Sequence, residues 1–228
     1  SEDLETQAAA LRASYNAMSA TVQANEKVVA ALTQLGEADT KIASLKTVHE
    51  QHVADAAQLV EEIGALGAIT AESKETLEDL YSRYNDLPEA YRAEVTNYTA
   101  LQTAIGTYLT AISQPNENGE STVLHFDESL GQTQVGSVAG AANITTDYST
   151  EVKFGSESGS LRVAFGATTA GAAGDLNLAQ SVSLSGYDEV HIWVNNAFGG
   201  RMAFYIDWKT SDSAIGDIVT GGNIDAGY

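Results

Sequence analysis

One stretch of the chain places an aromatic ring beside side chains that can bond to hydroxyl groups. In residues 190–195, strand alternation predicts one face with His191, Trp193 and Asn195, and an ordinary apolar core stripe on the other face. An aromatic plane can lie against the C–H surface of a sugar ring, while His and Asn can bond to the sugar hydroxyls. The pattern favours a carbohydrate-binding face. The alternative is that Trp193 packs in the interior, between two sheets or under a loop.

A second predicted strand, residues 201–208, carries further candidates for the same surface. Its alternation predicts a core stripe at the even-numbered positions and an outer face that includes Arg201 and Tyr205. If the two strands are neighbours, Arg201 and Tyr205 join His191 and Trp193 on one surface. Otherwise they belong to a solvated strand face with cross-strand pairs. Phe198, in the turn between the strands, either stacks at the rim of that surface or folds back onto the core.

Acidic side chains after the first predicted strand indicate a candidate metal site. Asp127 and Glu128 end that strand. Four aspartates lie late in the chain, at Asp207, Asp212, Asp217 and Asp225. Carboxylates from a first and a last strand are hard oxygen ligands that suit a structural Ca²⁺ ion. We expect that the protein requires no cofactor. Because surface acids are abundant and no EF-hand spacing is present, a solvated acidic surface is the alternative.

Two histidines form a second, weaker candidate. His49 and His52 lie three residues apart on a predicted helix, so they could supply two metal ligands. The sequence indicates no third ligand near them. A solvated or half-buried pair is therefore the favoured interpretation.

The signatures of catalysis are absent from the sequence. It contains no Gly-x-Ser-x-Gly elbow, no phosphate-binding glycine loop and no His-Glu-x-x-His. It also contains no cysteine, which removes thiolate zinc sites and cysteine nucleophiles. The paired carboxylates of a glycosidase are left open, because their spacing in the chain is not fixed. We therefore expect a protein that is not an enzyme.

Composition excludes two classes of partner. The 31 acidic and 11 basic residues give a formal charge of −20, which repels phosphate backbones and anionic membrane surfaces. No run of apolar residues approaches the length of a transmembrane helix, so no membrane insertion is expected. No signal peptide begins the chain. If the protein is exported, we expect a leader that precedes Ser1; the alternative is that Ser1 is an internal position of a larger parent surface protein.

The first half of the chain has the pattern of a helical bundle. Residues 1–113 are rich in Ala, Glu, Leu and Gln with apolar residues at helical spacing. We expect a first helix that ends at Gly36 and a second that starts at Asp39 or Thr40 and runs to residues 64–67. A third helix is expected from Thr70 or Ser73, and Pro88 then forces a break before a last helix. The sum is a long hairpin followed by a smaller three-helix packing.

The second half has the pattern of antiparallel strands. Residues 114–121 are predicted to be a linker because they carry turn formers and charged residues. Residues 122–228 then favour a jelly-roll-like β-sandwich with short strands separated by glycine-bearing turns, and whether this sandwich is complete at its C-terminus stays open. The strands are expected at residues 122–126, 160–165, 181–184, 189–195 and 201–208.

Residues 57–110 resemble a helical repeat common in large surface proteins of Gram-positive gut bacteria. The residues that carry the resemblance are Ile63-Gly64, Ile69-Thr70, Leu77, Tyr84, Leu87, Val95, Asn97-Tyr98, Leu101 and Ala104. In that family a tyrosine ends one helix, a short turn follows and a Val-x-Asn-Tyr segment opens the next helix. Pro88, at the turn, is a departure from the pattern. The resemblance implies a spacer on a cell surface.

Residues 122–208 resemble the β-sandwich domains of carbohydrate-binding modules. The matching segments are Val123–Asp127, Gly159–Val163 and Leu184–Val194. The resemblance implies a non-catalytic module that binds an extracellular polysaccharide, held away from the cell wall by the helices. Two other interpretations stay open: a structural stalk or protein-binding adhesin, and an accessory segment of an enzyme whose catalytic domain lies outside this chain.

Overall fold

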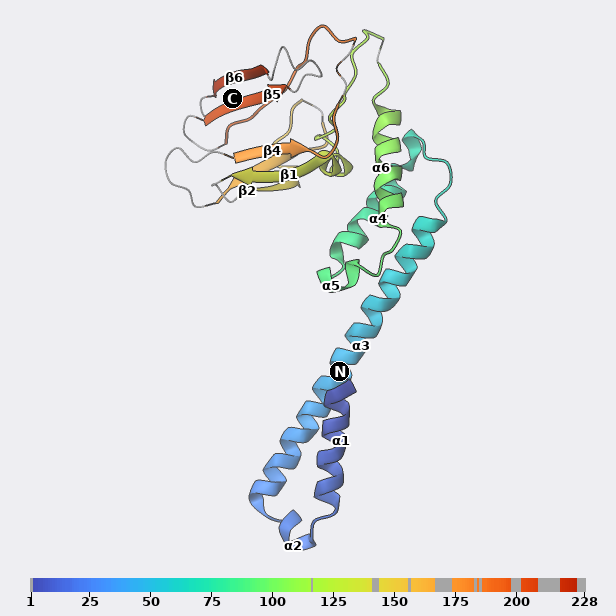
Figure 1. The fold of residues 1–228 in the computed structure, drawn as a ribbon, viewed down its shortest axis with the longest axis vertical. Coiled ribbons are helices and arrows are strands. Elements are labelled where there is room, and N and C mark those ends of the chain that lie inside the picture. Colours follow the sequence, from blue (N-terminus) through green and yellow to red (C-terminus); the bar gives the residue numbers. More distant parts are fainter. Residues whose placement is uncertain are drawn as a thin grey trace. The chain divides into compact units, whose positions relative to one another are not determined.

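The computed structural model describes residues 2–115, 117–140, 144–155, 157–166, 174–182, 184, 186–197, 202–208 and 218–224. The chain divides into two units, Ser1–Gln114 and Pro115–Tyr228. The first unit is helical and the second contains small antiparallel sheets (Figure 1). The expected order, helices followed by antiparallel strands, is therefore confirmed.

One long helix organises the helical unit. The helices of this unit are α1 (Glu2–Asn16), α2 (Ala20–Gln23), α3 (Glu26–Gly64), α4 (Lys74–Asp86), α5 (Glu89–Arg92) and α6 (Tyr98–Ile112), with a 3₁₀ turn η1 (Ala71–Ser73). The short helix α1 lies beside the first part of α3, and α2 joins them (Figure 1). Across the part of the chain that the structure describes, no helix is both long and apolar enough to cross a membrane.

The predicted break at Gly36 is wrong. Helix α3 continues through Gly36, and the chain turns earlier, before Asn25. The Asn25 side chain caps α3 by accepting a hydrogen bond from the Lys27 N–H at 3.0 Å. Thr40, expected to cap a new helix, instead donates its hydroxyl to the Gly36 carbonyl oxygen at 2.9 Å, one turn earlier. A single internal glycine costs a helix only about 1 kcal/mol, so good helix formers on both sides override it.

The later helix boundaries are as expected. Thr70 and Ser73 form a reciprocal capping box, in which the Thr70 N–H donates to Ser73 Oγ at 3.0 Å. Helix α4 ends at Asp86, just before the break at Pro88. Asn97 joins the start of α6 to α3 because its side-chain N–H donates to the Val60 carbonyl oxygen at 2.9 Å.

The core of the helical unit lies where α3, α4 and α6 pack together. Four of its side chains are almost fully buried: Leu59, Leu77, Leu101 and Ile105. They come from three different helices, so their burial fixes the later half of α3 against α4 and α6. Tyr84 and Tyr98 stack beside this core with ring centroids 3.7 Å apart.

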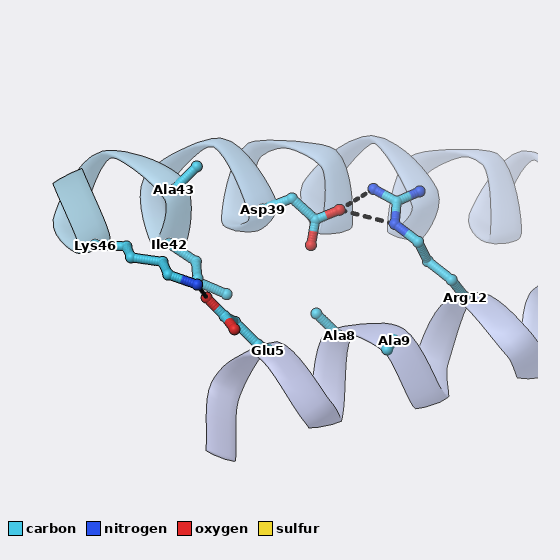
Figure 2. A pocket seen from close by; sticks show the side chains of 8 residues that line it. All are labelled: Glu5, Ala8, Ala9, Arg12, Asp39, Ile42, Ala43 and Lys46. Atoms are coloured by element: carbon cyan, nitrogen blue, oxygen red, sulfur yellow. Dashed lines mark hydrogen bonds and ion pairs between the residues drawn. The ribbon is translucent and has the colours of Figure 1, made fainter. Parts of the chain in front are cut away.

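The contact between α1 and α3 is much thinner. Of the α1 side chains that the structure describes, only that of Ala8 is buried. Figure 2 shows small side chains at this contact, with an ion pair of Arg12 and Asp39 on one side and of Lys46 and Glu5 on the other. Six large apolar side chains of the two helices are 44–60% exposed: Leu4, Leu11, Val29, Leu45, Val48 and Val53.

The second unit, as far as it is described, contains three antiparallel strand pairs. Strand β1 (Val135–Gly140) pairs with β4 (Gly174–Leu178), β2 (Ile144–Ser149) with β3 (Ser160–Phe165), and β5 (Met202–Trp208) with β6 (Ile218–Ile224). A 3₁₀ segment, η2 (Ser129–Gln134), precedes β1. Leu130 of this segment is 1% exposed, which makes it the most deeply buried apolar side chain among the described residues of the unit.

Two of the five predicted strands are present, and the other three ranges form no strand in their described residues. Strands β3 and β5 lie within the predicted ranges 160–165 and 201–208. Residues 122–126 and 189–195 form no strand, and neither do the described residues of 181–184. At 122–126 the Gln134 side chain occupies the place of a partner strand. Its Oε1 accepts the His125 N–H at 2.7 Å and its Nε2 donates to the Val123 carbonyl oxygen at 3.0 Å.

The unequal burial of leucines gives a direct test of where the helical unit is held together. Leu101→Ala should lower the free energy of unfolding by about 3 kcal/mol, because a fully buried leucine leaves a cavity. Leu45→Ala, the same change at a helix position that is 52% exposed, should cost less than about 1 kcal/mol. Urea unfolding followed by circular dichroism at 222 nm measures both. Equal losses would contradict the placement of the core.

Candidate functional site

Trp193 lies on the surface of the second unit, not between sheets. Its side chain is 67% exposed and belongs to an irregular segment, residues 186–197. One face of its ring stacks on Phe154, with ring centroids 4.0 Å apart and planes inclined by 14°. Phe154 is itself 51% exposed. The two rings form an aromatic pair at the surface, contributed by segments about 40 residues apart in the chain.

The loop that carries Phe154 is held by two hydrogen bonds. It joins β2 to β3, which pair antiparallel. The Glu157 N–H donates to the Phe154 carbonyl oxygen at 3.0 Å, and this turn passes through Gly155 at a φ of +57°, where a glycine avoids strain. The Ser160 hydroxyl donates to the Val152 carbonyl oxygen at 2.6 Å. These bonds fix the backbone on both sides of Phe154.

The segment that carries Trp193 lies between a hydrogen-bonded turn and a buried residue. It begins at a turn in which the Tyr187 N–H donates to the Leu184 carbonyl oxygen at 3.2 Å. It ends near Asn196, whose residue surface is only 1% exposed. The burial of Asn196 places the chain against the interior of the unit three residues after Trp193. The exposed ring therefore lies on a segment that enters the interior directly after it.

Polar side chains lie on the same segment as Trp193. His191 and Asn195 are exposed, and His191 Nε2 lies 3.1 Å from a carboxylate oxygen of Glu189. The predicted core stripe opposite them is wrong, because Val190 and Ile192 are 44% and 45% exposed. Residues 189–195 join none of the described sheets, so no described strand pairs with this segment to cover these side chains.

The other predicted sugar-binding residues are placed in part. Tyr205 is 60% exposed on β5, and Phe204 and Ile206 beside it are half-buried, as strand alternation predicts. No ring contact joins Tyr205 to Trp193 in the described part of the unit. Arg201 and Phe198 lie outside the described residues.

Phe154 was missed by the sequence analysis. The signal for it was an aromatic residue directly before a glycine, Phe154-Gly155, between two runs of strand-forming residues. Such a position is the tip of a hairpin, where a large apolar side chain has no core to enter. Its pairing with Trp193 could not be predicted, because the two residues belong to separate loops.

The acidic candidates lie together with a third carboxyl group. A hydrogen bond with Asp127 raises the pKa of Glu157 above its ordinary value, and burial and the charges of Asp127 and Glu128 act in the same direction. The Tyr148 hydroxyl donates to the Asp127 carbonyl oxygen at 3.1 Å, which ties this corner to β2. Among the described residues, no group of three or more His, Cys, Asp or Glu side chains has the arrangement of a metal site.

The late aspartates do not add to this cluster as it is described. Asp212, Asp217 and Asp225 lie outside the described residues, and nothing is described of the Asp207 side chain. A calcium ion held by Asp127 and Glu128 stays a prediction.

The two histidines pack against an aromatic ring. His49 Nδ1 lies 2.9 Å from the Tyr91 hydroxyl oxygen, and the His52 ring centroid is 4.9 Å from that of Tyr91. His49 is exposed and His52 is half-buried, in agreement with the interpretation as a solvated or half-buried pair. Through Tyr91 they attach α5 to α3.

Comparison with known proteins gives no match: no family model, no curated protein and no solved structure matches this chain. The interpretation of the surface around Trp193 therefore depends on its own residues and geometry. The resemblances of residues 57–110 and 122–208 stay predictions.

The stacked tyrosines of the helical unit predict an alkaline loss of stability. Burial, followed by the nearby Tyr81 and Tyr84, raises the pKa of Tyr98 from 10.0 to about 12. A group with a raised pKa contributes stability that is complete below pH 10 and is lost as the pH rises through about 12. The urea midpoint of the helical unit should therefore fall between pH 9 and pH 11.5, and it should fall less in Tyr98→Phe. An equal fall in the variant would contradict this assignment.

Proposed function

We propose that the unit Pro115–Tyr228 is a non-catalytic domain that binds an extracellular polysaccharide. The observation that carries this proposal is the exposure of Trp193, at 67%, with one face of its ring stacked on Phe154. A large aromatic side chain costs free energy when it is exposed to water, and it regains that free energy when an apolar surface covers it. The C–H face of a sugar ring is such a surface.

Each residue that the sequence predicts for sugar binding has a role in this proposal. Trp193 stacks on the sugar ring, while His191 and Asn195 bond to its hydroxyl groups. Tyr205 is the second aromatic contact, and Arg201 is the expected charged donor beside it. No residue is assigned a catalytic role, and the domain is proposed to hold its ligand unchanged.

The charge of the chain favours an uncharged ligand. The chain has a formal charge of −20, and Glu189 and Glu151 are exposed acids near the two loops of the aromatic pair. A polyanionic polysaccharide would be repelled by this field. Neutral polymers such as starch, cellulose, xylan or mannan carry no such penalty.

The helical unit is proposed to be a spacer of a bacterial surface protein. Helix α3 has 39 residues, which at 1.5 Å per residue corresponds to a length of about 58 Å. A rod of this length can hold a binding domain away from a cell wall. We also propose that the three strand pairs belong to one β-sandwich of jelly-roll type, which the antiparallel pairing of all three supports.

The test is retention on insoluble polysaccharides. The chain should be retained on one neutral polymer, and Trp193→Ala should weaken that binding by about 30-fold, because truncating an aromatic anchor costs about 2 kcal/mol or more. Tyr187→Ala, on the same segment and outside the proposed contact, is the matched control and should bind normally. Both variants should unfold at the temperature of the parent chain. Retention on none of the polymers, or undiminished binding by Trp193→Ala, would overturn the proposal.

A second candidate function is protein binding by the helical unit. It is favoured by the exposed apolar side chains of α1 and α3, such as Leu4 and Leu11. In this case the chain is a stalk or an adhesin segment, and the strands are a further spacer. Binding of a protein partner that is lost in Leu4→Ser with Leu11→Ser, and kept in Trp193→Ala, would distinguish it from the first candidate.

A further inference from the structure

We propose that Phe154 is a positioning residue for the Trp193 ring, and that the pair offers one sugar-binding face, the face of Trp193 that Phe154 leaves free. This inference rests on the proposed function. The inference goes beyond that function because it assigns a positioning role to a residue on a different loop. It also limits the ligand to one ring contact at this aromatic pair.

The geometry of the pair indicates that Phe154 holds the Trp193 ring from one side. The two rings are nearly parallel, inclined by 14°, with centroids 4.0 Å apart, so one ring covers a face of the other. Trp193 is nevertheless 67% exposed. Its exposed area must then come from the opposite face and from the ring edges. A sugar ring can lie flat only on that opposite face.

The backbone beneath each ring explains which one can support the other. Phe154 starts a turn closed by the Glu157 N–H, and the neighbouring Val152 carbonyl oxygen is held by Ser160 of β3. Among the described strands, none pairs with residues 189–195 of the Trp193 segment. An exposed side chain on an irregular segment samples several rotamers unless another group restricts it. Phe154, on the hydrogen-bonded hairpin, is the group that restricts Trp193.

Preorganisation is the physical benefit. A ring that is already held in its binding orientation loses less conformational entropy when a ligand covers it. Because an aromatic pair contributes beyond the area it buries, loss of the Phe154 ring should weaken sugar binding by about three- to tenfold. Loss of Trp193 itself should remove most of the binding, since Trp193 is the residue that touches the sugar.

Three variants separate positioning from simple burial. Phe154→Tyr keeps the aromatic ring and should bind the retained polysaccharide within about twofold of the parent chain, because its ring stacks similarly. Phe154→Leu and Phe154→Ala should bind about three- to tenfold more weakly. The matched control is Phe165→Ala, which removes another exposed phenylalanine, 42% exposed, from β3 of the same unit and should bind normally.

A spectroscopic signature reports the pair without any ligand. Of the two tryptophans in the chain, the indole signal of Trp193 is identified by its loss in Trp193→Ala. Phe154→Ala removes a ring that lies flat against Trp193, so the Trp193 indole signal should shift. Phe165→Ala should leave the Trp193 signal in place.

The outcomes are distinguishable. Weaker binding in Phe154→Leu and Phe154→Ala, with rescue by Phe154→Tyr and the expected indole shift, supports the inference. Normal binding by Phe154→Ala overturns it and leaves the proposed function standing. Absence of binding by the parent chain overturns the proposed function, and the inference with it. An indole signal of Trp193 that does not move in Phe154→Ala overturns the pairing itself.

Discussion

Backbone polar groups must be paired before an irregular segment can hold a side chain in one place, and the second unit depends on this constraint. Its first segment is held by the amide of Gln134, which bonds to the backbone of Val123 and His125. Gly131 lets the backbone pass close to His125, because a Cβ atom at this position would collide with the His125 carbonyl oxygen. The loop of Phe154 is held in the same manner by Ser160. Side-chain hydrogen bonds thus replace strand pairing where the sheets are small.

The two units are stabilised differently, and this difference separates their proposed roles. The helical unit concentrates its burial where α3, α4 and α6 meet, around residues such as Leu77 and Leu101. Its α1–α3 contact buries few side chains and leaves large apolar side chains exposed to water. A spacer can tolerate such exposure. In the second unit the described strands pair two by two, and the exposed aromatic residues lie on loops and on an open strand face. The first unit suits a spacer, and the second suits presentation of a ring to a ligand.

Local signals in the sequence were sufficient to predict helix caps, helix breaks and two of the strands. They were not sufficient to predict which strands or side chains pair with one another. Thr70, Ser73 and Pro88 act through their immediate neighbours, so their effects could be predicted. The break predicted at Gly36 was wrong because the free-energy cost of one glycine inside a helix is small. Continuing the helix, whose later half packs against α4 and α6, gains more free energy than the glycine costs. The missing strand at residues 189–195 and the contact of Phe154 with Trp193 depend on residues distant in the chain, which alternation does not report. Trp193 was identified by its type, and its exposure could only come from the structure.

We propose that the free face of Trp193 contacts a sugar. A ligand titration that follows the indole signal of Trp193 measures this contact. A soluble oligosaccharide of the polymer that retains the chain would be added to protein labelled at its two tryptophans. We expect a saturable shift of the Trp193 signal and loss of the response in Trp193→Ala. Binding that leaves the Trp193 signal in place would contradict it, because the ligand would then occupy another surface of the molecule.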